Sequence, residues 1–143
     1  AYEAALEVYE PLYPLLKHKP EFLFEAAQSL SKTGQYEKAN EYLERAVLLS
    51  SDPMLYYVMA KNEQCLGEYR QAEKHLLHAI DILPERIYPY YLLMNLYTEP
   101  SYFQPAKLKK AIDSVLTKKP KVESSAIKEM KEKARSMLNN TSI

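Results

Sequence analysis

A segment of this chain repeats itself at a distance of 33 residues. TGQYEKANEYLERA at 33–46 aligns without gaps with LGEYRQAEKHLLHA at 66–79. The identical positions are Gly34 and Gly67, Tyr36 and Tyr69, Ala39 and Ala72, Leu43 and Leu76, and Ala46 and Ala79. A period in the low thirties is typical of stacked units that bury their apolar faces only against neighbours. With two glycines in 143 residues and no alternating apolar run, these units are predicted to be helical.

The Gly-x-Tyr-x-x-Ala turn at this period resembles the tetratricopeptide repeat family. That resemblance implies an all-α fold, a right-handed superhelix of antiparallel helix pairs, also called an α-α solenoid. Each residue of the turn has a mechanical role. Glycine permits a left-handed backbone between two helices, tyrosine fills the corner, and alanine lets the helices approach closely.

The apolar pattern predicts eight helices within one domain covering 1–143. We expect them at 2–18, 21–32, 35–49, 53–65, 68–82, from about 87, 105–118 and 124–140. The first is the second helix of a truncated repeat, and complete repeats cover 20–50, 53–84 and 87–120. Pro11 and Pro14 should interrupt or restart the first helix, because proline removes a backbone donor and clashes with the preceding turn.

The last helix, 124–140, is predicted to cap the stack. Ser124 or Ser125 should be its N-cap, with Ile127, Met130 and Ala134 along the covering stripe. A repeat stack needs such a helix, because its last repeat would otherwise expose the face that a neighbour covers.

Three stretches carry a closer resemblance: YEPLYPLLKHKPEFLFEAAQSLSKTGQYEKA, LGEYRQAEKHLLHAIDILPERIYPYYLLMNLY and VLTKKPKVESSAIKEMKEKA. They are similar to the soluble C-terminal repeat region of bacterial O-antigen ligase/polymerase-like membrane proteins. The resemblance implies a bacterial parent whose membrane part transfers glycan, and it carries over no catalytic residue. The membrane face is left open. Since Ala1 already lies within a helical pattern, we expect the protein to extend upstream of it.

In tetratricopeptide stacks, positions two, five, nine and twelve of each first helix line a concave groove. Carried over, they are Glu21, Phe24, Gln28, Ser31, Met54, Tyr57, Lys61, Gln64, Tyr88, Tyr91, Asn95 and Thr98. The candidate ligand groove comprises Phe24, Gln28, Tyr57, Lys61, Gln64, Tyr88, Tyr91 and Asn95. Rigid aromatics beside polar groups suit an extended peptide or a partner helix. The alternative is that Tyr57 and Tyr91 pack between repeats, since 13 tyrosines supply many for the core.

No catalytic, metal or cofactor site is predicted. His75 and His78 are three residues apart on one helix, but no third ligand accompanies them, so exposed structural histidines are favoured. Glu63 should reach the surface or pair with a neighbouring base. Nothing near Cys65, the only cysteine, marks it as a nucleophile.

Charge is divided along a chain of zero net charge. Residues 1–105 hold 9 basic and 15 acidic side chains, and residues 106–143 hold 10 and 4. The basic part lacks the interleaved aromatics of a nucleic-acid platform, and no segment is apolar enough to insert into a membrane. The favoured function is a non-catalytic scaffold that binds a protein or peptide. A carbohydrate-binding module and a self-association module that assist surface glycan transfer are the alternatives.

Overall fold

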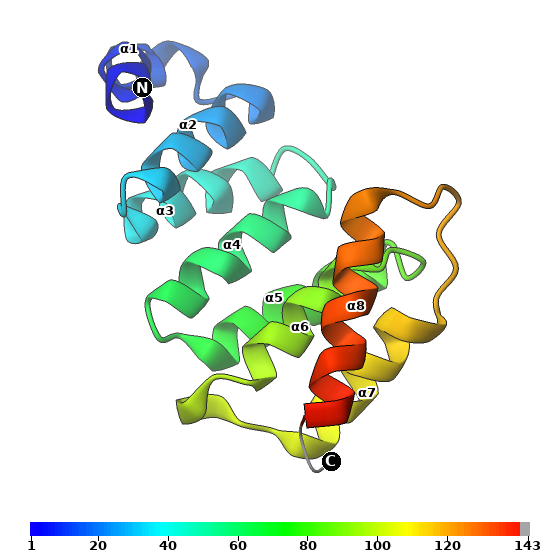
Figure 1. Ribbon diagram of the computed structural model, residues 1–143. Helices are drawn as coiled ribbons and strands as arrows, with labels where there is room; N and C mark the ends of the chain where they lie inside the picture. Colours follow the sequence, from blue (N-terminus) through cyan, green and yellow to red (C-terminus); the bar gives the residue numbers. More distant parts are fainter. Residues whose placement is uncertain (141–143) are drawn as a thin grey trace. The chain divides into compact units, whose positions relative to one another are not determined.

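The computed structural model describes residues 1–140, which are helical apart from their connections and contain no strand (Figure 1). The helices are α1 (Tyr2–Leu16), α2 (Pro20–Lys32), α3 (Tyr36–Val47), α4 (Met54–Cys65), α5 (Tyr69–Ile82), α6 (Tyr88–Tyr97), the 3₁₀ turn η1 (Pro100–Tyr102), α7 (Pro105–Thr117) and α8 (Ser125–Asn140). The described part of the chain divides into two compact units, the first covering residues 1–75 and the second residues 76–140, with the division inside α5. Within the part described, no helix has the length and apolarity that crossing a bilayer requires.

The first helix departs from its prediction. α1 runs without a break from Tyr2 to Leu16 and contains both Pro11 and Pro14. Each proline leaves the carbonyl four residues earlier, at Glu7 or Glu10, without its helical donor. All four residues are exposed. Water can therefore reach those carbonyls, and the helix continues.

The two repeat glycines take the predicted left-handed conformation, with φ of 83° at Gly34 and 76° at Gly67. Each closes its helix in the same way. The Gly34 amide donates to the Ser31 carbonyl at 3.1 Å, and the Gln35 amide donates to the Leu30 carbonyl at 2.8 Å. The same pair of bonds, at the same lengths, recurs around Gly67. This is the Schellman arrangement, which reverses the chain while satisfying the last carbonyls of the helix.

The core of the first unit lies between α2, α3 and α4, of which α2 and α3 run side by side (Figure 1). Leu23, Leu30 and Leu43 have no exposed surface, and the small Ala39 and Ala46 are equally buried. Alanines at these positions leave room for adjacent helices to approach, as the repeat pattern predicts.

A buried polar network fixes the register of these helices. Ser31 Oγ donates to Asn62 Oδ1 at 2.7 Å, and Asn62 Nδ2 donates to Asn40 Oδ1 at 2.8 Å. Asn40 Nδ2 donates in turn to the Met59 carbonyl at 3.2 Å. A half-satisfied buried amide is costly, so the network favours one alignment of α2, α3 and α4.

In the second unit, α6 and α7 form a helix pair, and α8 packs against both of them (Figure 1). Leu108, Ile112 and Val115 of α7 are fully buried, as is Ala134 of α8. The Ser124 hydroxyl accepts the Ile127 amide at 3.2 Å, so Ser124 is the N-cap that the sequence predicts. Lys131 Nζ donates to the carbonyls of Leu116 and Lys118 at the end of α7. There its charge also complements the helix dipole.

Candidate functional site

The predicted groove residues of α2 present an outward row. Gln28 is exposed, and Phe24 is half-buried and packs against the core of the first unit. Ser31, at the end of the row, is engaged with Asn62. The free part of this face therefore runs from Glu21 through Phe24 to Gln28.

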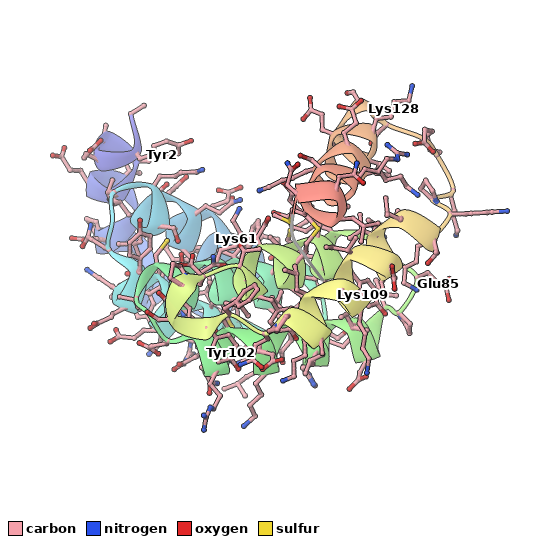
Figure 2. The ribbon with its side chains drawn as sticks, turned by 60° about the horizontal axis from the view of Figure 1, so that its bottom comes forward. Tyr2, Lys61, Glu85, Tyr102, Lys109 and Lys128 are labelled. Carbon is pink, nitrogen blue, oxygen red and sulfur yellow. The ribbon has the colours of Figure 1, made fainter. Side chains whose placement is uncertain are left out.

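The predicted groove residues of α4 divide between core and surface. Tyr57 is 4% exposed, so it packs inside the first unit and offers almost no ring surface to a ligand. The core alternative therefore describes Tyr57. Lys61 is exposed on the same helix (Figure 2), and Gln64 is half-buried. Contact with neighbouring helices, which a single sequence does not reveal, decides between these two outcomes.

A cleft of about 310 Å³ lies at the N-terminal ends of α2 and α4. Its lining comes from Pro20, Glu21, Phe24, Glu25, Ser50, Asp52 and Leu55. Phe24 and Leu55 supply apolar surface, while Glu21, Glu25 and Asp52 are exposed. Sequence reasoning placed Glu21 and Phe24 on the groove but missed the rest. The i, i+4 spacing of Glu21 and Glu25, which places both on one helix face, was the available signal.

In the second unit, Tyr88 and Tyr91 of α6 are half-buried and stacked, with ring centroids 6.4 Å apart and an interplanar angle of 23°. Lys133 of α8 lies over the Tyr91 ring, its Nζ 5.5 Å from the centroid. Asn95 is half-buried, and its Oδ1 is enclosed without a hydrogen-bond partner within the described part of the chain. The arrangement combines an aromatic pair with a cation on one face.

Glu63 and His75 form a pair that the sequence predicted only in part. Glu63 is 4% exposed, and its Oε1 lies 2.8 Å from His75 Nδ1. Gln71 Nε2 lies 3.3 Å from the other ring nitrogen. An imidazole protonated on Nδ1 satisfies both contacts, donating to the carboxylate and accepting from the amide. Of the two outcomes predicted for Glu63, surface exposure or pairing with a neighbouring base, the structure has the pairing. His75 is half-buried rather than exposed, whereas His78 is exposed as predicted.

The pKa values of Tyr36, Tyr42 and Lys38 lie above their ordinary values. A hydrogen bond with Cys65 raises the pKa of Tyr36, and burial raises the pKa of Tyr42. The Glu10 carboxylate, 2.9 Å from Lys38 Nζ, raises the pKa of Lys38. Among residues 1–140, no three His, Cys, Asp or Glu side chains gather closely enough to hold a metal ion.

Solved structures of low sequence identity share this fold. MamA superposes with a TM-score of 0.74 at 19% identity, over 96% of this chain and 79% of that one. MamA 41-end from Desulfovibrio magneticus RS-1 superposes with a TM-score of 0.72 at 18% identity, over 99% of this chain and 88% of that one. The all-helical, tetratricopeptide-like fold predicted from the repeat is confirmed.

Sequence comparisons identify the repeats themselves. Tetratricopeptide repeat protein 21A of Mus musculus is 35% identical over 79 residues, which make up 55% of this chain. The match spans only 6% of that protein's length. The family model described as anaphase-promoting complex, cyclosome, subunit 3 matches residues 1–79, more than half of the 143. The chain therefore belongs to the family of anaphase-promoting complex, cyclosome, subunit 3, and is built from tetratricopeptide-like repeats.

Proposed function

We propose that this chain is a non-catalytic scaffold that binds a protein or peptide along the first helices of its repeats. The observation that carries the proposal is the outward row on α2. Phe24 packs against the core while remaining partly exposed, and Gln28 is exposed one turn further on. A rigid aromatic beside an amide gives a partner both buried area and a hydrogen-bonding group that sets register.

Family and fold support the same proposal. A stack of paired helices presents an extended surface without requiring a catalytic centre. On the second unit, the proposed contacts are Tyr88, Tyr91 and Asn95 of α6, and on the first they include Lys61 and Gln64 of α4. Tyr57 is omitted because it is buried.

The finer proposals concern the ligand and the parent protein. Direct glycan binding would use the Tyr88–Tyr91 stack, but Lys133 already lies over one face of Tyr91, which leaves less ring for a sugar. A protein ligand is therefore favoured. Attachment to an O-antigen ligase-like membrane protein remains a proposal from the sequence resemblance. The upstream sequence of the natural gene, which would contain the membrane spans, tests it directly.

Peptide display tests the scaffold proposal. A randomised peptide library is selected on the immobilised chain, and the affinity of the recovered peptides is measured by fluorescence anisotropy. Phe24→Ala together with Gln28→Ala should weaken binding by about 1–2 kcal/mol or more. The control is Glu44→Ala, an exposed change on α3, which should leave affinity unchanged. Failure to select any peptide, or equal losses in both variants, would contradict the proposal.

A further inference from the structure

We infer that the cleft between the N-terminal ends of α2 and α4 binds a lysine or arginine side chain of the partner peptide. This inference rests on the proposed scaffold function and names the chemistry of one contact within it. The cleft lies wholly within the first unit, and its volume of about 310 Å³ falls at the small end of ligand pockets, which span roughly 300–1,000 Å³. Such a space suits one side chain.

The lining combines an apolar interior with an acidic rim. Leu55 is buried and Phe24 is half-buried, and both contribute to the lining. Glu21, Glu25 and Asp52 are exposed around it, and none of its lining residues is a cation. A long cationic side chain matches this division, because its methylene stem packs on apolar surface while its charged end stays near water.

The three carboxylates lack internal counterions. Among residues 1–140, no ion pair involves Glu21, Glu25 or Asp52. Two of them have structural roles, since Glu21 lies in the first turn of α2 and Asp52 Oδ1 accepts the Met54 amide at 3.0 Å. Glu25 has neither role, and it stands one turn from Glu21, where like charges repel. A bound cation would relieve that repulsion.

The surrounding charge favours the same ligand. The first unit, residues 1–75, contains 8 Lys and Arg against 12 Asp and Glu, a net charge of −4. An acidic field draws cationic segments toward the cleft and disfavours carboxylates and phosphates. The partly exposed ring of Phe24 adds a further attraction, because a cation over an aromatic face is stabilised by the ring quadrupole.

Peptide pools that differ at one position test the inference. Each pool contains peptides of about nine residues, roughly 30 Å when extended, with acetylated and amidated ends. The central residue is lysine, arginine, norleucine or glutamate, and the other positions are mixed. Norleucine keeps an aliphatic stem and removes the charge. The lysine and arginine pools should bind the intact chain about fivefold more tightly than the norleucine pool. Their advantage should shrink as added salt screens the rim charges.

Matched variants locate the preference. Glu21→Gln with Glu25→Gln should abolish the advantage of the cationic pools. The control is Glu37→Gln with Glu41→Gln, which removes two exposed carboxylates at the same i, i+4 spacing on α3 and should preserve the advantage. Glu21→Lys with Glu25→Lys should shift the preference to the glutamate pool. Circular dichroism confirms that each variant is folded.

The outcomes separate this inference from the scaffold proposal. Pools that bind without regard to the central residue overturn the cleft assignment and leave the scaffold standing. The cleft assignment is also overturned if the preference for cationic pools persists in the variant with Glu21→Gln and Glu25→Gln but disappears in the α3 control variant. The cation would then be recognised elsewhere. Absence of binding by every pool, together with failure of the peptide selection, overturns both.

Discussion

Removing the imidazole of His75 should destabilise the chain substantially, although the residue is half-buried and on no predicted binding face. Its Nδ1 lies 2.8 Å from Glu63 Oε1, and the Glu63 side chain is only 6% exposed. His75→Ala leaves that carboxylate in a site where water replaces the lost donor poorly. Breaking a buried pair costs about 3–5 kcal/mol. Because the His75 side chain is 17% exposed, water can enter in part, and we expect about 2–3 kcal/mol.

The repeat supplies a compensating change. Glu63 and His75 align, at the 33-residue offset, with Leu30 and Tyr42 of the preceding repeat, which are 0% and 9% exposed. Glu63→Leu with His75→Tyr therefore installs an apolar pair that this fold already contains. Replacing both partners of a buried hydrogen bond with well-packed apolar residues is often nearly neutral or stabilising. The double variant should lie within about 1 kcal/mol of the natural chain, or above it.

Urea unfolding followed by far-ultraviolet circular dichroism measures both effects. The control is Lys74→Ala, an exposed change next to His75 that should alter the unfolding free energy by less than about 0.5 kcal/mol. Equal losses in His75→Ala and Lys74→Ala would refute the reasoning. So would a double variant as unstable as His75→Ala, since the repeat alignment would then not predict the packing.

Three further predictions concern packing, the C-terminal helix and alkaline pH. Ala39→Phe and Ala72→Phe should each lower the unfolding free energy by about 1–3 kcal/mol, because both positions are buried against neighbouring helices; unchanged melting in both would rule out the repeat register. Deletion of 123–143 should uncover the apolar side of α7 and cause aggregation detectable by light scattering, and a monomer with the original melting temperature would show that α8 is dispensable. Burial raises the pKa of Tyr42 above its ordinary value of 10.0, because the folded chain disfavours the charged phenolate. The stability that the neutral Tyr42 side chain contributes is therefore complete below pH 10 and is lost as the pH rises through the higher folded pKa. Tyr42→Phe should reduce that alkaline loss, and an identical pH dependence in the variant would contradict the assignment.

Most of the fold could be predicted because it depends on local rules. The predicted helices at 21–32, 53–65 and 105–118 begin and end within one residue of α2, α4 and α7. Gly34 and Gly67 take positive φ because only glycine does so readily, and that requirement is visible in the sequence. Pro11 and Pro14 were misjudged, since their effect depends on whether the orphaned carbonyls face water.

The candidate site was less predictable because it depends on contacts between helices. Phe24 and Tyr57 occupy equivalent repeat positions, yet Phe24 is partly exposed and Tyr57 is only 4% exposed. The Glu63–His75 pair joins two helices across a turn, and neither residue alone indicates its partner. Glu25 and Asp52 approach one cleft only after the connection between α3 and α4 is placed.

The buried amides linking α2, α3 and α4 limit how freely these repeats can be rearranged by recombination or protein engineering. Asn62 serves both Ser31 and Asn40, but its counterpart one repeat earlier is Ser29, and the counterpart of Asn40 one repeat later is Glu73. A chain that duplicated the first repeat in tandem would set a serine opposite Asn40 and leave that amide short of its partner. Neighbouring repeats here are therefore not interchangeable modules. Ser31, Asn40 and Asn62 can form their hydrogen bonds only when the two repeats follow each other in the present order, so these polar groups specify that order.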